Sequence, residues 1–432
     1  MSRRKKTYWP FLVVLLIAVL AGCSDHRFCP TEGDEDDTGG LVLTQAQLVS
    51  ANNDFAFRLF KESVRDQPDS NIFISPLSVS MALGMTMNGA ARATLDSMLA
   101  TLGFPGYSLE SADRCYRNLI DLVTGLDPAV KFEIANSIWA RDGVTFEPSF
   151  LQACQTYFDA EVRSLDFTRD DAPDTMNAWV KAKTYGKIDH IVPNPMDPLT
   201  VMVLLNAVYF LGDWKYQFDP RDTRDDSFYP PQGPEIRCRM MSRPAISGPV
   251  ELLADYSVVL NDDFQAVDLP YGDSVFTMTL VLPRLGRDLD SLIAWFDADR
   301  WDSLAGSFHG CHGVLLMPKF ELRYESRLDD MLKALGMGIA FDPYRADFSR
   351  LCSYLELVIT AVRHKTYVRV DEVGTEAAAV TEVDVGPTSV PPECQEFWME
   401  ADHPFMLVIR ENRTNTVLFI GKIVDPGYFV GG

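Results

Sequence analysis

From residue 44 onward, the apolar positions of the chain alternate between the spacing of helices and that of strands. Apolar side chains over residues 48–60 recur on one helical face, and the polar stretch 66–70 ends that helix. Residues 72–75 predict a short strand that stops at Pro76. A second helix is predicted over residues 77–88, because the fixed φ and missing N–H of proline cost little at a helix start.

Longer apolar runs farther along the chain predict further strands. Residues 132–135 form one, and residues 201–210 form another that is apolar at nearly every position except Asn206. A strand of that composition is expected to be buried on both faces. Residues 267–271 and 276–282 predict a hairpin, with Gly-Asp in the turn between them.

The carboxyl-terminal part of the chain continues the mixed pattern. Residues 315–322 predict a strand, residues 326–335 a helix that ends at Gly336, and residues 417–423 a last strand. No second linker rich in Gly, Pro or Ser interrupts this pattern. We therefore predict an α+β fold in a single domain over residues 44–432.

Composition and charge narrow the class of protein. The chain has 432 residues, of which 47% are hydrophobic and 23% are charged, and these fractions are typical of a folded protein. The formal net charge of −22 excludes a nucleic-acid-binding protein that relies on a general positive field. It also argues against electrostatic docking on anionic membranes or heparin-like polyanions.

The amino terminus has the pattern of a secretory signal over residues 1–22. Basic residues at positions 3–6 precede an apolar run at 11–21, which is too short to span a bilayer. The ending Leu-Ala-Gly-Cys at residues 20–23 resembles a bacterial lipobox. That resemblance implies cleavage before Cys23 and a lipid anchor on this cysteine at the outer membrane or cell surface. Ordinary signal cleavage that falls near a cysteine is the alternative.

The segment over residues 23–43 predicts a flexible tether. It is polar and acidic and contains Gly39-Gly40, so it cannot bury a core, and its like charges favour an extended chain. We expect it to hold the folded domain away from the membrane surface.

Candidate metal and catalytic motifs are weak. His309-Gly310-Cys311-His312 lacks a defined fourth ligand and is interpreted as a turn. The hydrolase motifs Gly-x-Ser-x-Gly and His-Glu-x-x-His are absent. The eight cysteines are widely and irregularly spaced, without Cys-x-x-Cys pairs, which favours mostly buried free thiols. We expect no metal, no cofactor and no enzymatic activity.

Five blocks of sequence, in order, resemble the serpin family of serine protease inhibitors. They lie at residues 71–78, at 205–214, at 318–320 with 335–337 and 346–349, at 372–381, and at 402–405 with 418–422. The resemblance covers the chain from about residue 44 to residue 426. It implies a serpin fold with three β-sheets and eight or nine helices. It also implies an exposed reactive-centre loop over about residues 372–396 that serves as bait for a protease.

The residues of this loop have the alternation of a half-buried strand. From Thr375 to Val385, one face carries only small or β-branched side chains, and every charge, from Glu376 to Asp384, lies on the other face. Gly386-Pro387 then has the composition of an exposed loop. The resemblance reconciles the two patterns, because a serpin loop is bait first and a strand of the sheet after cleavage.

The resemblance also implies which residues act in inhibition. The family's count from Gly374 places the cleaved bond at Thr388-Ser389. The small Thr388 favours elastase-like or subtilisin-like proteases. The resemblance further implies that the inhibitor is a monomer and holds the protease as a covalent acyl complex. The hinge consists of Glu372, Gly374, Thr375, Glu376, Ala377, Ala378, Ala379 and Thr381. Its small residues are intact, which favours an inhibitor. Val373 departs from the acidic residue that the family often has at this position. A non-inhibitory serpin that acts as a binding protein and an inhibitor of cysteine proteases are the alternatives.

A polar cluster beneath the opening point of the sheet is the last feature that the resemblance implies. Ser75, Ser78, Asn206 and His364 match this gate, and Trp214 matches the residue where the loop enters. A structural hydrogen-bonding role alone is the alternative for each of them. No basic row that resembles a heparin-binding helix is found over residues 109–124, so no heparin site is expected.

Overall fold

The computed structural model describes residues 43–244, 254–375 and 396–427. The described part folds into two β-sheets and nine α-helices, with one large apolar core and a smaller apolar cluster beneath α6. None of the helices in these ranges is both long enough and apolar enough to cross a membrane.

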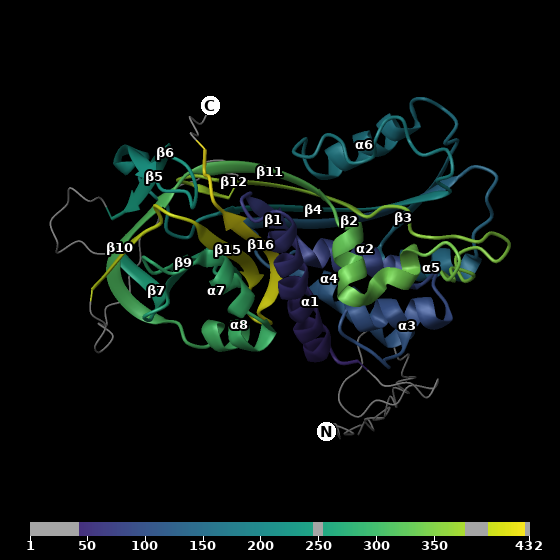
Figure 1. Cartoon of the computed structure of the whole chain (residues 1–432), viewed down its shortest axis with the longest axis horizontal. Coiled ribbons are helices and arrows are strands. Elements are labelled where there is room, and N and C mark those ends of the chain that lie inside the picture. The colour runs from purple at the N-terminus through teal and green to yellow at the C-terminus, as the bar shows by residue number, and fades with distance from the viewer. Residues whose placement is uncertain (1–42, 245–253, 376–395, 428–432) are drawn as a thin grey trace, which may run out of the picture.

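One sheet has six strands and extends along the molecule (Figure 1). Its order is β11 (Phe320–Arg327), β12 (Arg363–Val370), β13 (Gly374–Thr375), β4 (Met202–Asp213), β2 (Val130–Arg141) and β3 (Glu161–Leu165). Helix α6 (Ala172–Lys183) lies on one face of this sheet. Four helices lie on the other side, namely α1 (Gln45–Asp66), α2 (Pro76–Met87), α4 (Leu109–Val123) and α5 (Pro148–Phe158) (Figure 1).

The burial of β4 differs from the sequence prediction. Leu205 and Ala207 are buried beneath α6, whereas Met202, Leu204 and Val208 on the opposite face are only partly buried. The prediction that residues 201–210 are buried on both faces is therefore wrong. The physical reason is that most of the β4 edge that faces β12 has no paired strand among the described residues.

The second sheet has ten strands and lies against the helical side of the first. Its main path is β1 (Ile72–Ile74), β16 (Thr416–Ile423), β15 (Phe405–Glu411), β9 (Phe276–Pro283), β8 (Phe264–Pro270), β7 (Ala254–Leu260), β10 (His309–Pro318), β6 (Ile236–Arg243) and β5 (Arg224–Phe228), and β14 (Phe397–Glu400) pairs with β10. Strand β10 pairs with β7 over its first half and with β6 over its second half. Two of the three sheets that the family resemblance implies are therefore joined through β10.

The helices follow the local signals of the sequence closely. Their bounds are α1 (Gln45–Asp66), α2 (Pro76–Met87), α3 (Arg92–Thr101), α4 (Leu109–Val123), α5 (Pro148–Phe158), α7 (Leu289–Trp295), α8 (Ala298–Ala305) and α9 (Asp329–Leu332), with 3₁₀ turns at Pro220–Asp222 and Gly338–Phe341. Thr44 and Gln47 form a capping box at the start of α1. Ser75 caps α2, and Pro76 occupies its first turn as predicted.

The region after residue 315 differs from the prediction. The single strand predicted over residues 315–322 is two strands, because β10 ends at Pro318 and β11 begins at Phe320. The helix predicted from residue 326 begins only at Asp329, since Ser326 continues the buried face of β11. A π-helical turn over Lys333–Met337 follows, and Gly336 adopts a φ of +115° there, a value that favours glycine.

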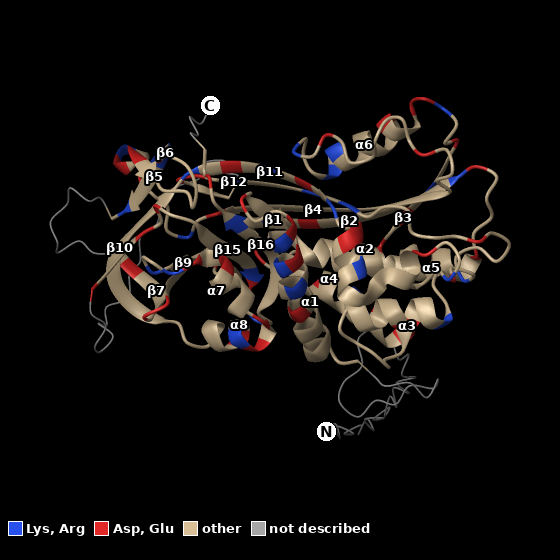
Figure 2. Cartoon of the chain, viewed as in Figure 1, with Lys and Arg blue, Asp and Glu red and all other residues tan. Residues whose placement is uncertain are grey.

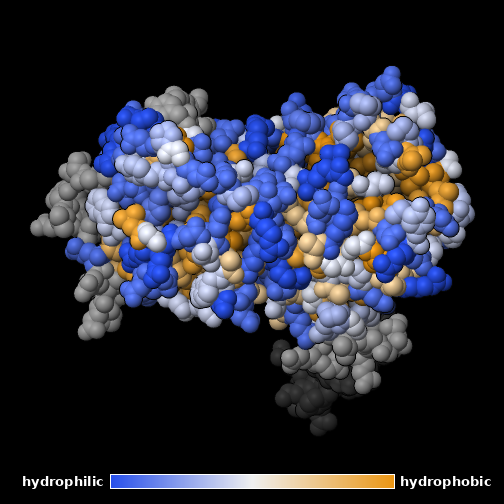
Figure 3. Space-filling view, in the orientation of Figure 1, coloured by the Kyte–Doolittle hydropathy of each residue, from blue (hydrophilic) through white to orange (hydrophobic). Residues whose placement is uncertain are grey.

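The surface of the molecule mixes charges of both signs. Acidic and basic residues are interspersed over helices and strands in both halves of the view (Figure 2). Hydrophobic residues gather mainly at the end of the molecule where β3 lies (Figure 3). The core beneath contains stacked aromatic rings such as Phe73 and Phe419, whose centroids are 5.2 Å apart.

Candidate functional site

The six-stranded sheet contains a gap between β4 and β12. Strand β13 joins them at one end, where Thr375 pairs with Gly212 of β4 and with Val370 of β12. Beyond this point, the facing edges of β4 and β12 have no partner strand in the part of the chain that the structure describes. Such edges expose backbone N–H and C=O groups that can pair with an additional strand.

Gly374 allows β13 to approach β4 closely. A Cβ atom at this position would collide with the carbonyl oxygen of Gly212 and would lie 2.7 Å from the Cα of Asp213. Any other residue would therefore push β13 away from β4. The end of the gap where β13 joins the sheet is thus fixed by a glycine in the predicted hinge.

Trp214 binds the segment that leads into β13. Its backbone N–H donates to the carbonyl of Val373 at 2.7 Å, and its indole Nε1 donates to the carbonyl of Asp371 at 2.9 Å. The indole also stacks on Tyr271, with ring centroids 4.5 Å apart. The Tyr271 hydroxyl is 2.6 Å from the Thr375 hydroxyl, and burial raises the pKa of this tyrosine, so the phenol stays protonated.

Glu372 is held by a buried ion pair beside Trp214. Its carboxylate accepts from Lys319 Nζ at 2.7 Å and from the Thr223 hydroxyl at 2.6 Å, and its carbonyl accepts from the N–H of Phe218 at 2.9 Å. Burial alone would raise the pKa of Glu372, but the hydrogen bonds from Lys319 and Thr223 outweigh it and lower the pKa. The carboxylate is therefore charged at neutral pH.

The start of α2 is bound to the β12 edge of the gap. His364 of β12 accepts a hydrogen bond at Nε2 from the backbone N–H of Ser75, at 3.0 Å. The Ser75 hydroxyl donates to the carbonyl of Leu418 in β16 at 2.8 Å and also caps the N–H of Ser78. His364 is fully buried, and this burial lowers its pKa to about 4. The neutral imidazole that results can act as the acceptor that Ser75 requires.

The same helix start is bound to the β4 edge. The Ser78 hydroxyl donates to Oδ1 of Asn206, and Asn206 Nδ2 donates to Oδ1 of Asn136 in β2 at 2.7 Å. Asn136 Nδ2 in turn donates to the carbonyl of Phe158 at 2.7 Å. Asn206, which interrupts the apolar run over residues 201–210, is thus part of a hydrogen-bonded network, as expected for a polar group in an apolar strand.

The structure brings the predicted gate residues into this one region. Ser75 and Ser78 lie at the start of α2, His364 on β12 and Asn206 on β4, while Trp214 lies at the end of the gap with Glu372, Gly374 and Thr375. The remaining site residues lie outside the described residues; they are Glu376, Ala377, Ala378, Ala379, Thr381, the bond Thr388-Ser389, and Cys23.

Sequence reasoning missed several residues of this site. Tyr271, Lys319, Thr223 and Asn136 each contact a predicted residue directly. Lys319 does stand in a family-like block, at residues 318–320, but nothing in the sequence pairs it with a glutamate at position 372.

The described cysteines fall into two kinds. Cys154, Cys238 and Cys352 are free and buried, whereas Cys115 and Cys311 are disulfide-bonded. The preference for mostly free thiols is thus correct for the first group and wrong for the second. The turn predicted at residues 309–312 is wrong, because these residues form the start of strand β10. His312 pairs with Asp255 at 2.6 Å, and the described residues contain no group of three or more His, Cys, Asp or Glu side chains that could hold a metal ion.

Comparisons with known proteins agree with one another. Residues 50–426 match the family model described as serpin (serine protease inhibitor). An uncharacterized serpin-like protein of Methanosarcina acetivorans is 30% identical, with 97% of this chain and 98% of that protein covered. Serpin B9 of Homo sapiens is 32% identical, with 88% of this chain and 99% of that protein covered. The native-state crystal structure of the thermophilic serpin Tengpin has a TM-score of 0.77 at 29% identity, with 92% of this chain and 96% of that chain covered.

Proposed function

The chain belongs to the serpin family, and on this premise we propose that it traps elastase-like or subtilisin-like serine proteases as covalent complexes. Members of this family are in general protease inhibitors and not enzymes. In the proposed mechanism a protease cleaves the bond Thr388-Ser389. The segment before the cut then enters the gap between β4 and β12 as a new strand.

The observation that carries this proposal is the register at β13. Thr375 faces Val370 on β12 and Gly212 on β4, both in antiparallel pairing. If the pairing continues by six residues along each strand, Thr381 comes to face His364 and Asn206. The hinge residue of the proposed strand that reaches the predicted gate would therefore be Thr381. Its small side chain can enter the sheet without burying a charge.

The alternation of side chains supports the same placement. Thr375 is buried, so Ala377, Ala379 and Thr381 would share its buried face. In the continued register, Glu376 would face Arg369 and Glu382 would face Arg363 on the solvent side of β12. Two of the three charges of the inserting segment, Glu376 and Glu382, would then lie opposite cations, which favours insertion in this register.

The free energy of the proposed insertion is large. A strand of about ten residues that pairs on both edges would gain roughly ten net backbone hydrogen bonds at about 1 kcal/mol each. A total on the order of 10 kcal/mol is comparable with the whole stability of an ordinary domain. That is enough to displace a tethered protease and distort its active site.

The chemistry in this proposal belongs to the protease. Its serine oxygen would bond to the carbonyl carbon of Thr388 while the bond to Ser389 breaks, and the amine of Ser389 would leave with the proton that the protease supplies. Insertion before water reaches the ester would keep the acyl bond intact. The small β-branched side chain of Thr388 suits a narrow primary pocket and excludes proteases that need Lys or Arg there.

Incubation with an elastase and with a subtilisin tests the proposal. We expect a complex that survives boiling in detergent, and mass spectrometry of the released carboxyl-terminal peptide should place the cut within two residues of Ser389. Thr375→Arg provides the matched control, because a charge on the buried face should allow cleavage but prevent trapping. Plain cleavage of the natural sequence would contradict the proposal and favour a non-inhibitory serpin. A complex with a papain-like protease alone would favour the cysteine-protease alternative.

We further propose that Cys23 carries a lipid and anchors the protein at the cell envelope. The basic, apolar and small-residue pattern of residues 1–23 supports this placement. Expression with a labelled fatty acid should label the natural chain and leave Cys23→Ala unlabelled and soluble. Equal labelling of the two chains would contradict the anchor.

A further inference from the structure

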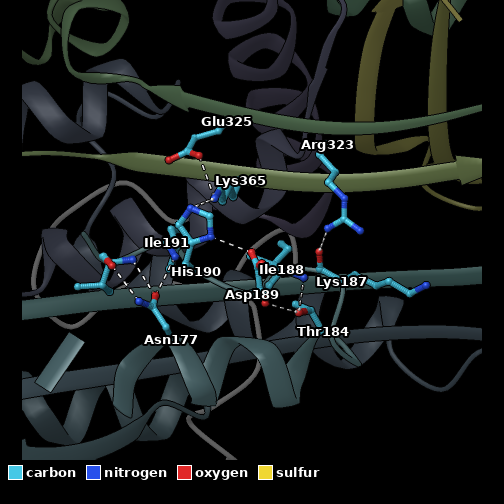
Figure 4. Close-up of polar contacts among 11 residues, drawn as sticks. Asn177, Thr184, Lys187, Ile188, Asp189, His190, Ile191, Arg323, Glu325 and Lys365 are labelled. Carbon is cyan, nitrogen blue, oxygen red and sulfur yellow. Dashed lines mark hydrogen bonds and ion pairs between the residues drawn. The ribbon is translucent and has the colours of Figure 1, made fainter. Parts of the chain in front are cut away.

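The segment that follows α6, residues 184–192, belongs to the β4 side of the gap. Asn177 of α6 accepts from the N–H groups of Ile191 and Val192 at 2.8 and 2.9 Å and donates to the carbonyl of Val192 at 2.8 Å (Figure 4). Ile188 and Val192 pack in the same apolar cluster as Leu205 and Ala207 of β4. The segment is therefore fixed to α6 and β4.

Polar contacts connect this segment to the strands on the other side of the gap (Figure 4). Lys365 of β12 places its Nζ 2.9 Å from Nε2 of His190. Arg323 of β11 donates to the carbonyl of Lys187 at 2.7 Å. Since His190 and Lys187 move with α6 and β4, these contacts span the gap from one side to the other.

The contact between His190 and Lys365 depends on the protonation of the imidazole. An ammonium can only donate, so Nε2 of His190 must accept, and the ring proton is on Nδ1, which is 2.8 Å from the Asp189 carboxylate. Lys365 also pairs with Glu325 of β11 at 2.9 Å. We name this chain of four residues, Asp189, His190, Lys365 and Glu325, the clasp.

We propose that the clasp holds the gap closed in the native state and that protonation of His190 releases it. His190 and Lys365 are then positioning residues for strand insertion, and acid speeds the entry of the loop. The proposal deepens the inhibitory function proposed above and depends on it. It assigns a regulatory role to the segment between α6 and β4.

Insertion and the clasp are geometrically incompatible. A new strand lies about 4.8 Å from each neighbour, so its entry moves β12 away from β4 by about that distance. In the register continued from β13, Val380 would come to lie between Lys365 and Ala207. A contact of 2.9 Å across the gap cannot survive this movement.

The charges around His190 define the direction of the pH effect. The groups that face it are Asp189 of its own segment and Lys365 of β12, with Glu325 of β11 behind the lysine. Once Nε2 of His190 carries a proton, it can no longer accept from the ammonium of Lys365. The imidazolium is then a second positive charge beside that ammonium, and the contact breaks. His364, the other histidine at the gap, has a pKa of about 4 and stays neutral from pH 8 down to pH 5.5.

The test measures how fast the full-length chain takes up a fluorescent peptide with the sequence of residues 375–388, at pH 8 and at pH 5.5. We expect uptake to be about fivefold faster at pH 5.5, in line with the loss of one hydrogen bond. His190→Gln should lose this pH response. Lys365→Met should take up peptide quickly at both pH values, and Lys365→Arg should retain the response of the natural chain.

His309→Gln is the matched control, because His309 is an exposed histidine on β10, away from the gap, and should leave the response unchanged. Uptake that is equal at both pH values, or an acid response that survives His190→Gln, would overturn the clasp and leave the inhibitory function intact. No uptake by any variant would overturn both. Hydrogen exchange of residues 187–192 in the unaltered chain gives a second readout, because release predicts lower protection factors at pH 5.5 and unchanged protection contradicts it.

Discussion

The imidazole of His364 accepts a hydrogen bond of 3.0 Å from the backbone N–H of Ser75. This bond attaches the start of α2 to β12, while Ser78, one turn into the helix, attaches it to Asn206 of β4. The helix start is thus bound to both edges of the gap in the six-stranded sheet. Any widening of the gap must break at least one of these attachments.

Asn206→Ala should loosen this attachment. The substitution leaves Ser78 and Asn136 without their partner, at a cost of about 1–3 kcal/mol for each buried group left unpaired. We expect an earlier appearance of inactive monomers and of polymers on native gels, and a higher stoichiometry of inhibition. Asn118→Ala is the control, because Oδ1 of Asn118 has no hydrogen-bond partner among the described residues. Identical behaviour of the two variants would contradict a gating role for Asn206.

His364 should make stability depend on pH. Its pKa is about 4 in the folded chain, below the usual value near 6.5, so the unfolded chain binds the proton more readily between these two values. Stability contributed by the neutral imidazole is present above about pH 6.5 and is lost as the pH falls toward 4, by about 3 kcal/mol in total. The melting temperature should differ less between pH 7 and pH 4.5 in His364→Gln than in the natural chain. An equal difference would argue against burial of the neutral form.

The ion pair of Lys319 and Glu372 should be important for stability. Both side chains are mostly buried, and removal of one partner leaves a buried charge, which costs about 3 kcal/mol. We expect Lys319→Met to lower the melting temperature and to favour polymers, and the double variant with Glu372→Gln to recover part of the loss. Lys333→Met is the control, because its partner Asp330 is almost fully exposed, and such pairs contribute about 0–1 kcal/mol. A loss in Lys319→Met no larger than that of the control would contradict the burial argument.

The proposed register predicts a charge swap. Arg363→Glu should repel Glu382 and slow insertion by about two- to fivefold, as expected for one cross-strand pair. Adding Glu382→Arg should restore the rate, which is measured by peptide uptake with matching peptides or by the partition between trapping and cleavage. Failure of the second change to rescue the first would indicate a different register.

The sequence was sufficient to predict the parts of this site that lie within continuous sequence motifs. The start of α2 at Pro76 and the strand around Asn206 follow from residues 71–78 and 205–214, whereas the polar cluster, which also contains His364, was implied by the serpin resemblance. Local chemistry explains these two predictions, since a proline suits the first turn of a helix and a lone asparagine in an apolar run needs a hydrogen-bond partner.

The sequence could not predict contacts between distant segments that have no periodic pattern. Lys319 and Glu372 are 53 residues apart, and His190 and Lys365 are 175 residues apart and lie on an irregular segment and a strand. The partial exposure of β4 was missed for a related reason, because a strand's own residues do not reveal whether both of its neighbours are present.

The central claim is that the segment before the cut enters the gap between β4 and β12 and thereby releases free energy. Differential scanning calorimetry of the intact chain and of the chain cleaved by an elastase, with both fragments retained, tests it most directly. About 10 kcal/mol of added stability should raise the melting temperature of the cleaved chain by about 10 °C or more. A cleaved chain that melts at or below the temperature of the intact one would contradict the account.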